Sequence, residues 1–145
     1  MAELEKSLWI DAPPRLVFTY FTQSEKMSQW AGIEAVLDPV PGGIYRLDMG
    51  KAGVITGRFD AVSDTRIVQI IDAPGGGTGS RIEITLAGEV GGCRVTIRHS
   101  GLPLPFDRLA ARGWDHHLAR LSVVATGGTV PPDPLCRKPM SALME

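Results

Sequence analysis

Cysteine is scarce in this chain: only Cys93 and Cys136 occur among 145 residues, and they follow no metal-binding or redox spacing. The sequence therefore gives no sign of a disulfide framework or a cysteine-based metal site. A chain of this length can bury about 68–70% of its unfolded surface, so a hydrophobic core alone can hold one domain together. Reduced thiols, as in a cytoplasmic protein, are the expectation.

An excess of charge of either sign is also missing, because 15 basic residues face 16 acidic ones and leave a formal net charge of -1. No basic run or acidic tail indicates a nucleic-acid or anionic-lipid partner. No hydrophobic run is long enough to cross a bilayer, and the N-terminus lacks the apolar core of a secretion signal. We expect a soluble cytoplasmic protein with no nucleic-acid partner and no membrane insertion.

The sequence does contain one long amphipathic segment, residues 106–125, which reads FDRLAARGWDHHLARLSVVA. At about 100° per residue, its apolar side chains fill about half of a helical circumference, and Arg108, Arg112 and Asp115 lie on the opposite arc. This pattern predicts a helix whose apolar face must pack on something apolar. His117 breaks the pattern, because it projects close to the middle of the apolar arc.

Most of the chain before this helix shows the period-two alternation of β-strands. Two short helices are expected after the first strand, one started by Pro13 and Pro14 and one with Ser24 as its N-cap. The glycine-rich run 75–79 lacks the ending and the following helix of a phosphate-binding loop, so it is interpreted as a turn. The expected strands lie around residues 4–10, 33–37, 45–49, 55–61, 67–71, 82–86 and 93–99.

The predicted fold class is α+β, with a curved antiparallel sheet of six to seven strands wrapped around the long helix. After Gly128 the composition changes to a Pro-rich segment without periodicity. We assign residues 1–126 to one domain and residues 127–145 to a tail, which would be ordered only if it is held against its own domain or a neighbour. Cys136 in this tail is expected to be exposed and oxidisable.

Two histidines are the candidate polar groups between sheet and helix. Alternation places His99 on the inner face of the last strand, and His117 lies on the apolar side of the helix. If the two elements face each other, both imidazoles could orient a bound ligand or act as general acid or base. Alternatively, His99 hydrogen-bonds the turn before the helix and His117 caps a filled core. Both interpretations stay open.

Other reactive constellations are not supported by the spacing. His116 and His117 are adjacent and point about 100° apart, and no nearby cysteine or carboxylate is expected to complete a ligand set, so no metal site is predicted. Ser100 lies on the strand face opposite His99 and lacks a nucleophile-elbow sequence. A hydrolase triad is therefore not expected.

Large side chains on the inner faces could form the walls of a ligand cavity, with the Tyr45 hydroxyl as a polar group. Packing of an ordinary core would select the same residue types, so the pattern alone does not separate the two. The predicted lining consists of Trp30, Tyr45, Leu47, Phe59, Ile84, Ile97, His99, Trp114, His117 and Leu121.

These features, in this order, resemble a known family. They are Ile10-x-Ala-Pro-Pro-x-x-Val-Phe18, Trp30, Pro41-Gly-Gly43, Gly57-x-Phe59, Val95-Thr-Ile-Arg-His-Ser-Gly-Leu102 and Gly113-Trp114-x-x-x-Leu118-x-x-Leu121. Over roughly residues 4–126 the chain is similar to the bacterial homologues of the activator of the heat-shock protein 90 ATPase, in the START-like (SRPBCC) superfamily. The resemblance implies a helix-grip fold with a deep, largely apolar cavity between the terminal helix and the sheet.

The resemblance implies no particular reaction, since relatives bind lipids, polyketides and hormones, and some catalyse cyclisation or hydrolysis. The favoured hypothesis is binding of an apolar or aromatic small molecule, without a cofactor. A cyclase-like or hydrolytic enzyme that uses His99 or His117 is the second hypothesis. The third is a protein-interaction or co-chaperone-like module, including a homodimer.

Overall fold

The sheet of this protein is fully antiparallel and has seven strands in the order β1-β7-β6-β5-β4-β3-β2. The computed structural model describes residues 2–73, 78–103 and 106–139. The strands are β1 (Ala2–Ile10), β2 (Glu34–Leu37), β3 (Ile44–Asp48), β4 (Val54–Val62), β5 (Arg66–Asp72), β6 (Thr78–Glu89) and β7 (Gly92–Leu102). The helices are α1 (Pro14–Thr22), α2 (Ser24–Met27), η1 (Gly50–Ala52), α3 (Phe106–Ala125) and η2 (Pro134–Arg137). The predicted α+β fold is confirmed, although most of the glycine-rich run 75–79 lies outside the described residues.

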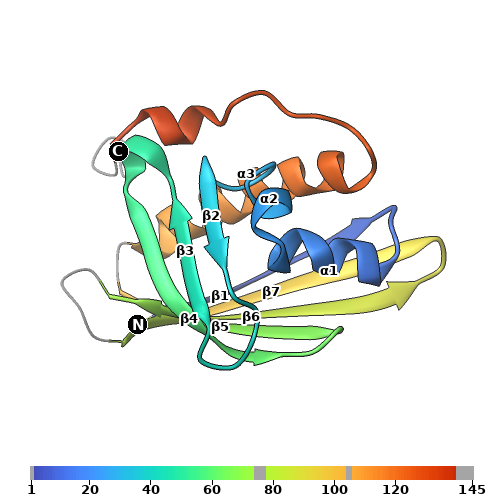
Figure 1. Cartoon of the computed structure of the whole chain (residues 1–145), viewed down its shortest axis with the longest axis horizontal. Coiled ribbons are helices and arrows are strands. Elements are labelled where there is room, and N and C mark those ends of the chain that lie inside the picture. The colour runs from blue at the N-terminus through green and yellow to red at the C-terminus, as the bar shows by residue number, and fades with distance from the viewer. Residues whose placement is uncertain (1, 74–77, 104–105, 140–145) are drawn as a thin grey trace.

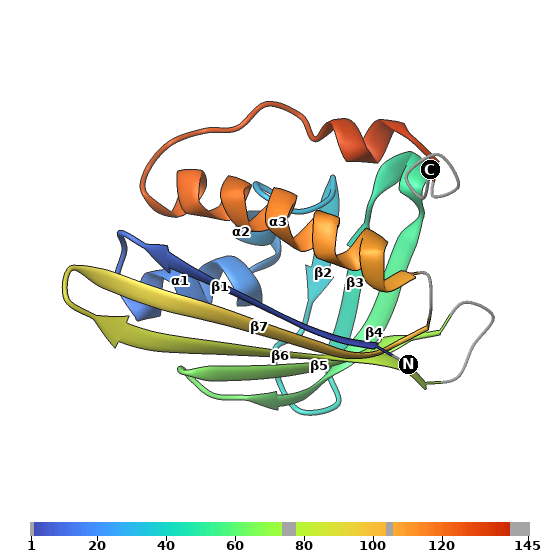
Figure 2. The same ribbon diagram turned by 180° about the vertical axis from the view of Figure 1, so that it is seen from behind.

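The sheet is curved, and α3 lies across its concave side (Figures 1 and 2). From β2 to β7 each strand pairs with the next one along the chain, while β1 pairs with β7 at the far edge. Cross-strand partners point to the same face, so the register identifies which side chains lie beneath α3. One such row runs through Phe59, Gln69, Ile82 and His99 on four adjacent strands. All four side chains of this row are buried.

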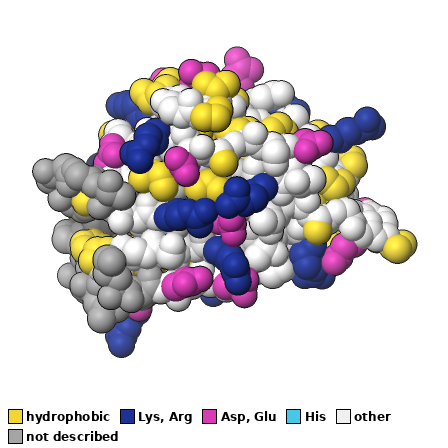
Figure 3. All heavy atoms as spheres, turned by 90° about the horizontal axis from the view of Figure 1, so that it is seen from below, with side chains coloured by type: hydrophobic (Ala, Val, Ile, Leu, Met, Phe, Trp, Pro, Cys, Tyr) yellow, Lys and Arg dark blue, Asp and Glu magenta, His cyan; other side chains and the backbone are white. Residues whose placement is uncertain are grey.

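The convex face of the sheet, seen in Figure 3, carries many charged side chains. Glu83 pairs across the sheet with Arg98, and Arg98 pairs with Glu5 on β1. Arg66 lies 2.7 Å from Glu83, and Arg98 lies 3.1 Å from Glu5. Exposed ion pairs contribute little stability each, but they keep this face hydrated. The apolar side of α3 therefore packs on the opposite, concave face.

Helix α3 begins and ends at the predicted residues, Phe106 and Ala125. Its side chains Leu118, Leu121 and Val124 are buried in the core. Polar contacts fix its position at several points. The Tyr20 hydroxyl of α1 donates to the Val124 carbonyl at 3.1 Å, and Lys6 of β1 lies 3.0 Å from Asp115. No helix within the described residues is both long and apolar enough to span a bilayer.

The tail passes over the side of α3 that faces away from the sheet (Figures 1 and 2). Its short helix η2 packs against η1, so the tail is held by its own domain. Cys136 is only 7% exposed, and the prediction of an exposed, oxidisable thiol is therefore wrong. Composition misled here because it contains no information on contacts between distant segments.

The predicted N-cap role of Ser24 is also wrong. Helix α2 begins at Ser24, and Gln23 is its N-cap residue. The Ser24 hydroxyl instead accepts a hydrogen bond from the Leu37 backbone N–H at 3.0 Å. Ser24 thus connects α2 to the end of the edge strand β2, which local sequence rules do not anticipate.

Shortening a buried side chain of α3 tests how strongly the helix depends on the concave face. Leu121 is fully buried, and Leu121→Ala should lower the free energy of unfolding by about 2–5 kcal/mol, because it leaves a cavity. Val123 on the same helix is 41% exposed, so Val123→Ala should change it by less than about 0.5 kcal/mol. Urea denaturation measures both. Equal effects would contradict the packing described here.

Candidate functional site

Most of the predicted cavity residues lie beneath α3 and belong to one hydrophobic core. Trp30, Tyr45, Leu47, Phe59, Ile84, Ile97 and Leu121 are all buried members of this cluster. The rings of Tyr45 and Phe59 pack edge to face with centroids 5.9 Å apart. Trp114 is partly buried and packs against the same cluster. The burial that strand alternation predicts is therefore confirmed for Tyr45, Leu47, Phe59, Ile84 and Ile97.

His99 lies on the inner face, 8% exposed, and both of its ring nitrogens have partners. The Trp114 indole N–H donates to Nδ1 at 3.0 Å, and Nε2 lies 2.9 Å from the Ser80 hydroxyl. Because an indole nitrogen can only donate, Nδ1 must be unprotonated and Nε2 carries the hydrogen. Burial lowers the pKa of His99 to about 4. The ring is thus a neutral link between β6, β7 and α3.

Gln69 was not singled out by the sequence pattern, yet its side chain holds a buried nitrogen without a hydrogen-bond partner among the described residues. It is 1% exposed and lies between Phe59 and Ile82 in the concave row. Its Nε2 is fully buried and has no hydrogen-bond partner in the described part of the chain. The alternation of side chains along the strand could have identified it, since residue 69 shares the inner face with Ile67 and Ile71. The residues around Gln69 are apolar on both faces, so this alternation is not visible in the sequence.

The Tyr45 hydroxyl is a second polar group on this face. Burial raises the pKa of Tyr45 well above its usual range, so the phenol stays protonated. Tyr45 pairs with Gly57 on β4, and Gly57 pairs with Ile71 on β5. The ring therefore lies two strands from β5, and its hydroxyl can donate or accept a hydrogen bond.

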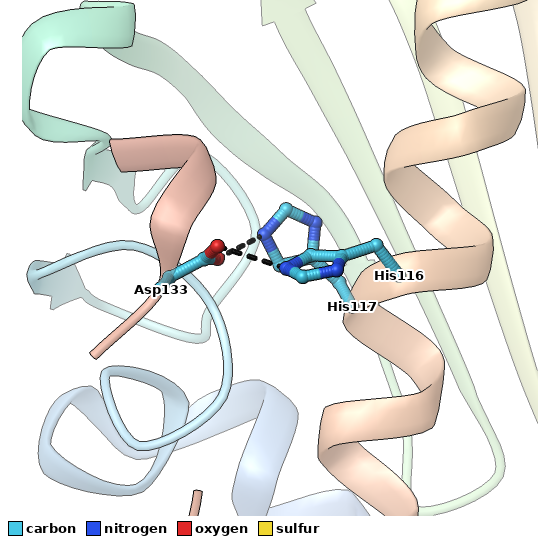
Figure 4. A group of neighbouring side chains, drawn as sticks. All are labelled: His116, His117 and Asp133. Atoms are coloured by element: carbon cyan, nitrogen blue, oxygen red, sulfur yellow. Dashed lines mark hydrogen bonds and ion pairs between the residues drawn. The ribbon is translucent and has the colours of Figure 1, made fainter. Parts of the chain in front are cut away.

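His117 has a different environment from His99. Its Nε2 lies 2.9 Å from Oδ2 of Asp133, and Nε2 of the neighbouring His116 lies 2.8 Å from Oδ1 of the same carboxylate (Figure 4). The expectation that no carboxylate lies near these histidines is wrong. Asp133 comes from the tail. An Asp directly before Pro134 is typical of a helix start, and this was the one sequence feature that could have indicated its role. The structure thus gives His99 and His117 separate sets of partners.

The charges in this cluster influence one another. Burial is the main cause that lowers the pKa of His117, and the Asp133 carboxylate opposes it. Burial would raise the pKa of Asp133, but the Leu135 backbone N–H and the two histidines together hold it below its usual value. Asp133 is therefore a buried carboxylate anion, surrounded by donors.

A groove of about 560 Å³ lies between the tail, α3 and the connection from α2 to β2. Arg120 and Val124 of α3 form one wall, and residues 128–133 of the tail form another. None of the cavity residues predicted from the sequence contributes to its described lining. The groove and the concave face are thus two separate surfaces, on different sides of α3.

Comparison with known proteins places the chain in a family. The sequence model described as "Activator of Hsp90 ATPase homolog 1-like protein" matches residues 11–126. An AHSA1-like protein from Rhizobium etli, solved by NMR, is 32% identical, with 92% of this chain and 87% of that chain covered and a TM-score of 0.70. No curated protein matches the chain.

Two less similar structures share the fold. The Aha1 dimer from Colwellia psychrerythraea is 16% identical, covers 88% of this chain and 98% of its own, and has a TM-score of 0.78. An HSP90 activator from Plasmodium falciparum is 18% identical, covers 87% and 97% respectively, and has a TM-score of 0.76. These likenesses establish the helix-grip architecture.

The neutral His99 link predicts a pH dependence of stability. The pKa of His99 is about 4 in the folded chain against an ordinary 6.5, so the unfolded chain takes up the proton first. The neutral His99 ring contributes fully to the free energy of unfolding above pH 6.5. This contribution is lost as the pH falls toward 4, which lowers the free energy of unfolding by about 3 kcal/mol in total. His99→Gln keeps an acceptor for Trp114 and a donor for Ser80 but does not titrate.

Urea denaturation of both proteins across this pH range measures the difference. We expect the stability of the wild type to fall more steeply with acid than that of His99→Gln. Parallel pH profiles would contradict the assignment of a neutral, buried imidazole.

Proposed function

Because the chain belongs to the family of Activator of Hsp90 ATPase homolog 1-like proteins, we propose that it binds an apolar or aromatic small molecule between α3 and the concave face of the sheet. The ligand carries an oxygen that accepts a hydrogen bond. This is the favoured hypothesis from the sequence, with the polar contact now assigned to Gln69.

The observation that carries the proposal is the buried Nε2 of Gln69, which has no hydrogen-bond partner among the described residues. A buried amide without a partner costs about 1–3 kcal/mol, because it has lost its bonds to water and gained none. Buried polar groups in proteins are nearly always paired, and an exception calls for a reason. A ligand oxygen that accepts from Gln69 supplies the missing bond.

The surroundings of Gln69 fit an apolar ligand. Its cross-strand neighbours Phe59 and Ile82 offer aromatic and aliphatic contact area. His99 on β7 lies two strands away on one side, about 10 Å at ordinary strand spacing. Tyr45 lies two strands away on the other side. Polar groups are thus few and separated, which is typical of sites that orient a mainly apolar molecule.

An acid–base enzyme receives less support from the same geometry. Both nitrogens of His99 are engaged, with Nδ1 occupied by the Trp114 donor. A general base needs a free lone pair within reach of the substrate. His117 directs its Nε2 to the tail carboxylate. A binding function therefore agrees better with the contacts of both histidines.

A co-chaperone-like module is the second candidate, favoured by the name of the matching family. Val36 on the edge strand β2 is 39% exposed and offers an apolar contact for a partner. The ATPase rate of purified Hsp90 with and without the chain tests this function directly. Native mass spectrometry of the full chain reports its subunit count, and so tests a homodimer.

Removing the unpaired amide separates binding from stability. Gln69→Leu should raise the free energy of unfolding by about 1 kcal/mol, because a buried donor without a partner disappears. The same variant should bind the dye anilinonaphthalene sulfonate, an aromatic probe with acceptor oxygens, about 5- to 100-fold more weakly. Fluorescence titration and urea denaturation measure the two effects.

The matched control is Gln29→Leu. Gln29 is exposed and lines the groove beneath the tail. This variant should bind the dye as the wild type does. Equal affinity of Gln69→Leu and wild type would refute the proposed site, and weaker binding by Gln29→Leu alone would place the dye in the groove.

A further inference from the structure

We propose that His116, His117 and Asp133 bind one divalent transition-metal ion of the zinc class, which fastens the tail to α3. The three side chains converge from two segments, the middle of α3 and the start of η2 (Figure 4). This inference is independent of a ligand beneath α3, because its three residues bond one another and not the buried row from Phe59 to His99.

The distances suit a shared ion. One ligand atom from each residue lies within 4.8 Å of the others. The two Nε2 atoms are 2.8 and 2.9 Å from separate oxygens of Asp133. Ligand atoms around tetrahedral zinc are about 3.3 Å apart, given metal–ligand bonds of about 2.0–2.2 Å. Small shifts of side chains would therefore bring all three groups to bonding distance.

The chemistry of the donors points to the class of ion. Two imidazole nitrogens and one carboxylate oxygen are a set used by zinc and by other first-row transition metals, whereas magnesium and calcium prefer oxygen alone. Three protein ligands leave at least one position for water. Asp133 has no exposed side-chain surface, and His117 is 13% exposed, so the site is largely shielded from solvent.

Neighbouring backbone groups orient the ligands. The Leu135 N–H donates to Oδ1 of Asp133 at 2.9 Å, which fixes the rotation of the carboxylate. The backbone of Gly113, one turn earlier in α3, acts on the ring of His117 in the direction that raises its pKa. Such second contacts hold metal-binding side chains in a fixed direction.

One positive group lies close by. Nε of Arg120 is 3.9 Å from Oδ2 of Asp133, but it donates its hydrogen bond to the Trp30 carbonyl at 3.2 Å. The carboxylate is therefore not saturated by Arg120. The alternative is a latch made of hydrogen bonds alone, in which each imidazole Nε2–H donates to Asp133 and no ion binds. The two states make different predictions for a titration with zinc.

The test is calorimetric titration of the full chain with zinc chloride after treatment with a chelator. We expect about one zinc ion per chain, and about 100-fold weaker binding or more for Asp133→Asn, because a direct ligand is lost. Bound zinc should also slow hydrogen exchange in residues 129–139 of the wild type, since it ties Asp133 to α3.

A second variant, His116→Gln, separates the loss of a metal ligand from the mere release of the tail. His116 is 31% exposed, so its replacement leaves no buried defect, and it should weaken zinc binding to a similar extent. Asp115→Asn is the matched control, because this exposed carboxylate pairs with Lys6 and lies outside the cluster. Its zinc affinity should equal that of the wild type.

Three results would overturn the proposal. One is no zinc binding by the wild type, which leaves the hydrogen-bonded latch. Another is equal zinc affinity in the wild type, Asp133→Asn and His116→Gln. The third is a loss of affinity in Asp115→Asn as large as in Asp133→Asn, which would indicate diffuse binding to surface carboxylates.

Discussion

The structure depends on one constraint: the concave face of the sheet is apolar and must be covered. The strands alternate so that charged pairs occupy the convex face, and the buried row from Phe59 to His99 points the other way. Helix α3 supplies the cover, with Leu121 at its buried centre. Burial of this area is the main source of stability, and hydrogen bonds such as Tyr20 to Val124 fix the direction of the helix.

The buried polar groups beneath α3 differ in whether they have hydrogen-bond partners. His99 makes both of its hydrogen bonds as a neutral ring, and therefore belongs to the framework that holds α3. Gln69 lies one strand before Ile82 in the same row and has no partner among the described residues. A fold gains nothing from an unpaired amide in its core, since a leucine would fill the space at lower cost. This contrast is why the proposed ligand contact rests on Gln69 and not on a histidine.

The sequence predicted what local periodicity determines. The bounds of α3, the sheet and the inner position of His99 follow from periods of 3.6 and two, because one face of each element is buried. Asp133 and Cys136 lie in an aperiodic tail, whose burial depends on contacts with α3 and η1 that no local pattern encodes. Gln69 was missed for another reason: its neighbours are apolar on both sides, so the strand shows no visible interruption. The predicted N-cap role of Ser24 was wrong because the backbone N–H of Leu37, distant in sequence, donates to its hydroxyl.

Helix α3 is tied both to the sheet and to the tail, through two residues that lie three positions apart. Trp114 reaches down to His99 on the sheet, while His117 reaches Asp133 in the tail. Residues at this spacing are neighbours on a helix surface. The family match ends at residue 126, so the two histidines lie within the matched segment and the carboxylate follows it. The contact with the tail is therefore a second restraint on the helix that covers the concave face.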